Sequence, residues 1–201
     1  ADPVRLLRER PKDTMLARYW RYPVAADRGA LQADDVSRYS ALMAASQSFI
    51  AADILDAYPF ARHKRLLDIG GGAGAFLIAA LQRHRHLEGV LFDRPPEGCD
   101  AATLVRVIHD HDDDKALSIL KTAYAALRPS GVLILAEPMA EAAGAKAMGN
   151  AYFGLYLLAM GSGRPRTAGE LKALLRAAGF RTAQIRKTRR PLLVSVLVAQ
   201  V

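Results

Sequence analysis

Two kinds of segment alternate along this chain: short apolar runs, and longer stretches in which apolar residues recur every three or four positions. The runs predict strands at 65–68, 89–93, 99–108 and 132–137, of which the last is predicted to be buried. The spaced stretches predict helices at 36–58, 76–83, 115–127, 147–161 and 168–178. Strands that alternate with helices in this way predict an α/β domain with helices on both faces of a largely parallel sheet.

Helix boundary residues support two of these assignments. Thr167 and Gly179 fit the N-cap and the C-terminal stop of the helix at 168–178. Asp112 to Asp114 fit the cap of the helix at 115–127.

The spacing of the strands differs between the two ends of the chain. Strands at 181–188 and 192–198 flank Arg189-Arg190-Pro191, which predicts a closing antiparallel hairpin. The strands at 89–93 and 99–108 are also close, yet parallel strands need a crossover of about a dozen residues. We therefore infer that a segment of about 30 residues is absent between Pro95 and Asp100.

Composition narrows the class of protein. The 201 residues are 51% hydrophobic and 24% charged, enough for one sizeable core plus an appendage at residues 1–36. Without an apolar run of ~18 residues or a signal-type segment, a cytoplasmic protein is expected. The formal net charge of +8 is scattered, so solvated faces explain most of it; a weak contact with the inner membrane surface is a second possibility, and nucleic-acid binding is not expected. Cys99 is the single cysteine, so no internal disulfide forms.

A glycine-rich turn follows the first strand and precedes the helix at 76–83. Its glycines include Gly70, Gly72 and Gly74. Glycine permits positive φ and the close approach of a ligand, and the N-terminus of the following helix offers N–H groups to that ligand. The turn therefore predicts a nucleotide-type site, with a purely structural turn as the alternative.

Two cofactors fit this turn. Gly70-x-Gly72-x-x-Ala75 satisfies the dinucleotide fingerprint, with Asp93 as the acidic residue for the ribose. Asp68, however, would face a pyrophosphate there, whereas its carboxylate suits the ammonium group of S-adenosylmethionine. We favour S-adenosylmethionine.

Four polar side chains are predicted at the strand ends: Asp68, Asp93, His109 and Glu137. Open α/β sheets bind ligands at this carboxyl edge. Because Asp68 and Asp93 can bind a cofactor, His109 and Glu137 remain for catalysis. The Glu137 carboxylate would then bind the second ring nitrogen of His109. His109 and His111 would point to opposite sides of an extended strand, so no metal site is expected.

In their order along the chain, these motifs resemble those of the S-adenosylmethionine-dependent O-methyltransferases of the caffeic-acid type. The motifs are Leu67-Asp-Ile-Gly-Gly-Gly-Ala-Gly74, Phe92-Asp-Arg-Pro95, Val105-Arg-Val-Ile-His-Asp110 with Asp113, Pro129-Ser-Gly131, Leu135-Ala-Glu137 and Gly163-Arg-Pro-Arg-Thr167. The resemblance covers residues 37–201 and is greatest to the bacterial enzymes of carotenoid synthesis.

The resemblance implies a Rossmann-like class I methyltransferase fold, preceded at 1–36 by a remnant of a helical dimerisation domain. It implies S-adenosylmethionine as the cofactor, a homodimer, and a hydrophobic acceptor, namely a hydroxylated carotenoid of the hydroxyneurosporene or demethylspheroidene type. His109 would then be the general base and Glu137 the residue that orients it.

The resemblance also implies residues that bind the ligands. The cofactor would contact Asp68, Gly70, Gly72, Gly74, Asp93 and Arg94. The acceptor pocket would be bordered by Met43, and Tyr156 and Met160 would suit a long apolar acceptor, although core packing explains their helix equally well.

Three departures from the family pattern keep alternatives open, and one is the segment absent after Pro95, which would normally bring an acidic contact to the adenine. His111 stands where the family usually has tryptophan, and Pro165 where plant members carry a second glutamate near the catalytic histidine. The alternatives are an O-methyltransferase with a phenolic or polyketide acceptor, and a catalytically silent binding protein of the same fold. A nicotinamide-dependent oxidoreductase is disfavoured by Asp68 and by the lack of a Tyr-x-x-x-Lys pair.

Overall fold

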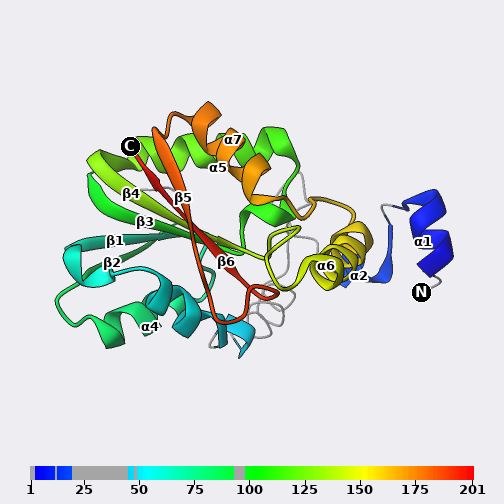
Figure 1. Cartoon of the computed structure of the whole chain (residues 1–201), viewed down its shortest axis with the longest axis horizontal. Coiled ribbons are helices and arrows are strands. Elements are labelled where there is room, and N and C mark those ends of the chain that lie inside the picture. Colours follow the sequence, from blue (N-terminus) through cyan, green and yellow to red (C-terminus); the bar gives the residue numbers. More distant parts are fainter. Residues whose placement is uncertain (1–2, 12, 20–44, 48, 93–97) are drawn as a thin grey trace.

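The computed structural model describes residues 3–11, 13–19, 45–47, 49–92 and 98–201, and it confirms the α/β fold (Figure 1). Its strands are β1 (Arg65–Ile69), β2 (Glu88–Phe92), β3 (Cys99–Val105), β4 (Leu127–Glu137), β5 (Thr182–Arg186) and β6 (Ser195–Gln200). Its α-helices are α1 (Pro3–Glu9), α2 (Met15–Tyr19), α4 (Ala75–Arg83), α5 (Asp113–Ala126), α6 (Lys146–Met160) and α7 (Ala168–Ala178). Residues 49–57 are also helical, and two 3₁₀ turns are η2 (Phe60–Arg62) and η3 (Ile108–Asp110).

One six-stranded sheet, in the order β2-β1-β3-β4-β6-β5, organises the described residues. The first four strands run parallel, and β6 is antiparallel to both β4 and β5. The predicted C-terminal hairpin is therefore confirmed. Its second strand begins at Ser195 rather than at 192, because the N–H groups of Leu193 and Val194 both donate to the carbonyl of Arg190 in a turn.

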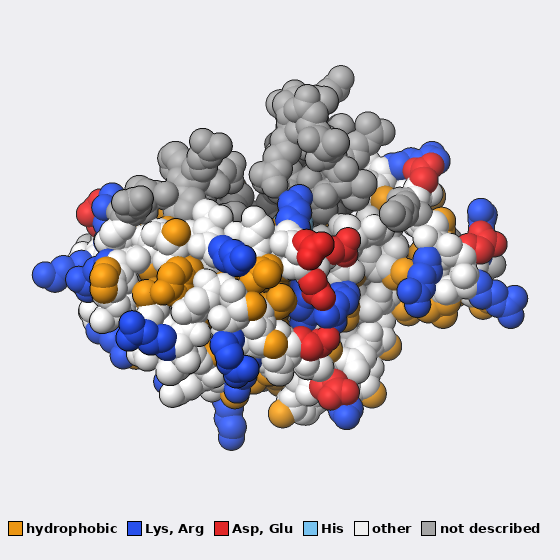
Figure 2. Space-filling view, turned by 90° about the horizontal axis from the view of Figure 1, so that it is seen from above, with side chains coloured by type: hydrophobic (Ala, Val, Ile, Leu, Met, Phe, Trp, Pro, Cys, Tyr) orange, Lys and Arg blue, Asp and Glu red, His pale blue; other side chains and the backbone are white. Residues whose placement is uncertain are grey.

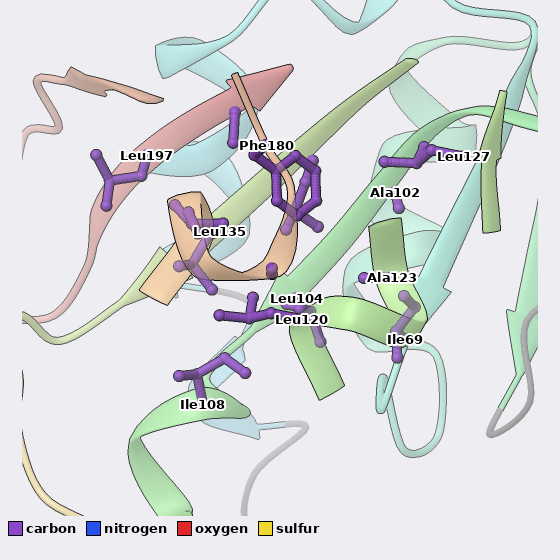
Figure 3. Packing of buried hydrophobic residues seen from close by; sticks show 14 of the residues in the cluster. Ile69, Ala102, Leu104, Ile108, Leu120, Ala123, Leu127, Leu135, Phe180 and Leu197 are labelled. Carbon is purple, nitrogen blue, oxygen red and sulfur yellow. The ribbon is translucent and has the colours of Figure 1, made fainter. Parts of the chain in front are cut away.

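Helices cover both faces of the sheet, as predicted (Figure 1). Adjacent strand residues alternate between the two faces, so Leu66 packs toward α4 and the helix at 49–57, whereas Leu67 packs toward α5 and α7. Figure 3 shows the second of these packing layers, to which Leu104, Leu120, Leu135 and Phe180 belong. Ile108 from η3 is part of the same layer, so this short turn is anchored in the core.

The helix boundaries follow the capping chemistry with one correction. The Thr167 hydroxyl accepts from the N–H of Glu170 in a complete capping box, and Gly179 ends α7 in the left-handed region. Asp112 occupies the N-cap position of α5, but its side chain caps nothing. Instead, its Oδ1 accepts a hydrogen bond from the N–H of Gly163.

The third strand is shorter than predicted, because β3 ends at Val105 and not at 108. Arg106 has a φ of 56°, a left-handed conformation that turns the chain out of the sheet. His109 therefore lies in η3 and not at the end of a strand. The expectation of two histidines on opposite sides of an extended strand was wrong for this reason.

The N-terminal helices α1 and α2 lie beside α6, away from the sheet (Figure 1). The Thr14 hydroxyl donates to the carbonyl of Ala159 near the end of α6. Within the described residues, no helix has the length and apolar character that crossing a membrane requires.

Candidate active site

Asp68 lies in β1 and is completely buried. Its Oδ1 accepts a hydrogen bond from the Thr103 hydroxyl at 2.7 Å, from the neighbouring strand β3. Its Oδ2 is buried without a hydrogen-bond partner. A buried carboxylate oxygen normally has a partner, so this atom marks a place where a donor can be added.

The glycine turn has the conformation that its sequence predicts. Gly70, Gly72 and Gly74 have φ values of 68°, 56° and 75°. Gly71 was not among the predicted site residues, yet a Cβ built on it would lie 2.2 Å from Asp68 Oδ2. The bare backbone at Gly71 therefore leaves room beside the unpartnered oxygen.

This pair of features fits a cationic group, such as the ammonium of the methionine part of S-adenosylmethionine. Burial raises the pKa of Asp68 to about 7, and the hydrogen bond from Thr103 only partly opposes that effect. A cation beside Oδ2 would stabilise the ionised carboxylate that burial disfavours. The residues present therefore suit the predicted cofactor.

His109 is buried between two carboxylates. Its Nδ1 lies 2.5 Å from Oε2 of Glu137, the last residue of β4. The other oxygen of Glu137 accepts from the N–H groups of Val107 and Ile108 at 3.1 and 2.7 Å. Because a carboxylate can only accept at Nδ1, the neutral imidazole would carry its proton there, and the lone pair of Nε2 would be left to take a second proton.

Asp110 supplies the second carboxylate, with Oδ1 at 3.2 Å from Nε2 of His109. Burial, the largest influence, lowers the pKa of His109, but the charges of Asp110 and Glu137 outweigh it and the pKa is raised. Burial also raises the pKa of Asp110, although His109 opposes this. The site therefore stabilises the imidazolium that forms when His109 takes a proton.

The glycine turn and the histidine segment are in contact. A Cβ on Gly70 would lie 3.0 Å from the Val107 side chain, two residues before His109. Asp68 and Thr103 are paired across β1 and β3, and Glu137 ends the next strand, β4. The cofactor turn and the His109–Glu137 pair thus share the carboxyl edge of the sheet.

The structure describes only some of the residues that were predicted to bind the cofactor or the acceptor. Asp93, Arg94 and Met43 lie outside the described residues. Met160 is fully buried at the end of α6, and Tyr156 is partly buried one turn earlier. Their predicted contact with an acceptor stays a prediction. No group of three or more metal-ligating side chains occurs in the described part of the chain.

Basic side chains are spread over the face of the molecule seen in Figure 2 and do not gather in one patch. This agrees with the scattered charge expected from the sequence.

Two arginines near the site were missed by sequence reasoning. Arg106, at a positive φ, donates from Nη1 to the Ser46 hydroxyl at 3.0 Å. Arg166 is buried and contacts the backbone around His109. The only available signal was that both lie within the family motifs, because their partners are 53 to 60 residues distant in the sequence.

Known proteins are similar to this chain in sequence and in fold. A model of the family described as "O-methyltransferase domain" matches residues 24–96 and 79–181. The demethylspheroidene O-methyltransferase of Rhodobacter capsulatus is 36% identical over 228 aligned positions, which cover 100% of this chain and 57% of that protein. The enzyme of the same name from Cereibacter sphaeroides is 33% identical and covers 99% of this chain, which spans 60% of its length.

Solved structures agree on the fold. The crystal structure of TnmH superimposes with a TM-score of 0.74 at 29% identity, over 82% of this chain and 57% of that one. Human N-acetylserotonin methyltransferase, solved in complex with S-adenosylmethionine, gives a TM-score of 0.81 at 20% identity, over 98% of this chain and 65% of that one.

Proposed function

The chain belongs to the O-methyltransferase domain family, and on that premise we propose that it transfers a methyl group from S-adenosylmethionine to a hydroxyl of a hydroxylated carotenoid. Family membership confirms the resemblance that the sequence motifs carry. The proposed acceptor rests on two relatives, 36% and 33% identical, that are named demethylspheroidene O-methyltransferases. The chain spans 57% and 60% of the lengths of these relatives, so their activity is a proposal for this chain.

One observation carries the proposal: the buried His109–Glu137 pair lies at the same sheet edge as Asp68. One oxygen of the buried Asp68 carboxylate accepts a hydrogen bond, and the other has no partner. The His109–Glu137 pair can move a proton, and the Asp68 carboxylate can hold a cationic ligand. A methyl transfer to a hydroxyl needs both, because the acceptor loses a proton as the sulfonium donor delivers its methyl group.

S-adenosylmethionine, when bound, supplies an electrophilic methyl carbon. Asp68 and the backbone of the glycine turn would hold its amino-acid part, and the predicted Asp93 and Arg94 its ribose. His109 would accept the hydroxyl proton at Nε2, while Glu137 fixes the ring through Nδ1. Because an aliphatic alcohol is far less acidic than a phenol, proton removal would be concerted with transfer.

The proton transfer predicts a pH profile for turnover. The pKa of His109 is raised above its usual 6.5, and a protonated imidazole cannot accept a proton. We therefore expect kcat to rise with pH, with an apparent pKa above 6.5, in steady-state assays from pH 5.5 to 9. Asp110→Asn removes a negative charge that raises the pKa of His109, so the increase of kcat should move to lower pH. A rate that falls across this range would contradict the assignment.

Cofactor binding should depend on pH for a separate reason. The pKa of Asp68 is about 7, so the carboxyl is mostly protonated below that pH and cannot pair with an ammonium group. We expect S-adenosylhomocysteine to bind about tenfold more weakly at pH 6 than at pH 8, with proton release below pH 7. Calorimetry in two buffers of different ionisation enthalpy measures both quantities. Asp68→Asn should bind weakly at every pH, and an unchanged slope in that variant would assign the titration elsewhere.

We also propose the domain organisation expected from the sequence: residues 1–36 as part of a helical dimerisation domain, and a segment absent between Pro95 and Asp100. The alignment with the Rhodobacter protein supports the second proposal, because its 228 positions exceed the 201 residues of this chain by 27. β2 and β3, on either side of the proposed break, both run parallel to β1. A homodimer and peripheral contact with a membrane remain part of this proposal.

The direct test supplies methyl-labelled S-adenosylmethionine with demethylspheroidene in detergent micelles, and a catechol as the phenolic comparison. We expect label in the carotenoid alone. Label in the catechol alone would favour a phenolic acceptor. Calorimetric titration with S-adenosylhomocysteine and with NAD runs in parallel, and binding of neither would favour a catalytically silent protein.

A further inference from the structure

A short strap, residues 162–166, lies across the backbone that carries His109. Four consecutive carbonyls of that backbone, those of residues 108–111, each accept a hydrogen bond from the strap. The donors, in the same order, are Arg166 Nη1 (3.0 Å), Arg164 N–H (3.0 Å), the Ser162 hydroxyl (3.0 Å) and Arg166 Nη2 (2.7 Å). The strap thus binds the carbonyl groups of this segment, whereas Glu137 binds the N–H groups of Val107 and Ile108.

Arg166 makes two of these four bonds with one side chain. Its side chain is only 1% exposed, and its Nε and Nη2 also contact Asp113 Oδ1 at 2.8 and 2.7 Å. The guanidinium thus joins the carbonyls of Ile108 and His111, which bracket His109, to the first turn of α5. A lysine cannot reproduce this, because its ammonium is a point donor and not a planar fork.

The strap is also packed too closely to shift. A Cβ on Gly163, whose φ is +74°, would lie 2.1 Å from the carbonyl oxygen of His109. Thr167, the next residue after Arg166, caps α7, and the carbonyl of Arg166 accepts from the N–H of Ala140. The strap is therefore also held by α7 and by the segment that follows β4.

We propose that Arg166 is a positioning residue for methyl transfer: by holding the backbone on both sides of His109, it keeps Nε2 aimed at the acceptor and Nδ1 on Glu137. This inference rests on the proposed function, because it assumes that His109 acts as the base. A misplacement of about 1 Å at a reacting group can cost on the order of 10²-fold in rate. The side chain of Arg166 contacts Ile108, His111 and Asp113, none of which is a predicted ligand-binding residue, so its loss should leave cofactor binding intact.

The test compares Arg166→Met and Arg166→Lys with Arg164→Met. Arg164 is the matched control: its side chain pairs with Asp113 and Glu170, but its contact with His109 is made by the backbone N–H and survives substitution. We expect Arg166→Met to lower kcat about 10- to 100-fold, Arg166→Lys less, and Arg164→Met less than threefold. The affinity for S-adenosylhomocysteine should change less than threefold in all three.

A second readout does not need turnover. The pH titration of the His109 ring, followed by NMR, should move to lower pH in Arg166→Met, because a looser ring loses part of its contact with Glu137 and Asp110. If the unaltered chain methylates nothing, the proposed function fails, but this titration still decides the role of Arg166. If Arg166→Met does not fold, kcat and the His109 titration are both measured on Arg166→Lys. Equal kcat and equal His109 titration in the Arg166 and Arg164 variants would overturn the proposal.

Discussion

His109→Gln is expected to lower kcat by about 10²- to 10⁴-fold, the usual contribution of a positioned general base. Glutamine can still face Glu137, but it has no lone pair of imidazole basicity to take the hydroxyl proton. The change lies outside the glycine turn, so the dissociation constant of S-adenosylhomocysteine should stay within about twofold. Single-turnover methyl transfer and calorimetry measure the two quantities separately.

His86→Gln is the matched control for this substitution. His86 is exposed just before β2, at the other end of the sheet, and its ring contacts the carbonyl of His63 and the ring of His84. It should leave both rate and binding unchanged. If His109→Gln keeps more than a tenth of the turnover, the base lies elsewhere. If it loses cofactor affinity in proportion to rate, His109 shapes the cofactor pocket instead.

Local signals in the sequence were enough for most of the fold. Both ends of α7 were predicted to the residue, because Thr167 is a typical N-cap residue and Gly179 a typical C-terminal stop. The strands β1, β3, β4 and β6 followed from short apolar runs, most of whose residues are buried, whereas the edge strands β2 and β5 are largely exposed. The start of β6 was predicted three residues too early. The residues from 192 onward are apolar like a strand, but those at 193 and 194 form a turn with the carbonyl of Arg190.

The residue types of the candidate site could be proposed from the sequence, but its local shape could not. Val105-Arg-Val-Ile looks like the continuation of a strand, and only Glu137, 30 residues later, accepts the N–H groups of Val107 and Ile108 and so bends the chain into η3. Arg166 reads as one more surface arginine in a chain of net charge +8, because its carbonyl partners are 55 and 58 residues earlier. Such contacts are tertiary and carry no local period.

Gly71→Ala is expected to weaken the binding of S-adenosylhomocysteine by about 10- to 100-fold. The new Cβ would lie 2.2 Å from Asp68 Oδ2, 2.8 Å from its Cγ and 2.9 Å from Leu91 Cδ1. Asp68 is completely buried and held by Thr103 through its other oxygen, so its carboxylate can yield only by turning away from the ligand. A hydrogen bond to a charged group contributes about 1.5–3 kcal/mol, which sets the expected factor.

A double-mutant cycle separates this mechanism from general damage to the turn. If Gly71→Ala acts by displacing the Asp68 carboxylate, then adding it to Asp68→Asn should weaken binding by less than about threefold, because the interaction is already lost. Gly169→Ala, where the nearest atom to the new Cβ is 3.8 Å away, controls for a glycine substitution as such. Additive losses in the cycle would mean that Gly71 contacts the cofactor directly. The unpartnered oxygen of Asp68 would then need another ligand to explain it.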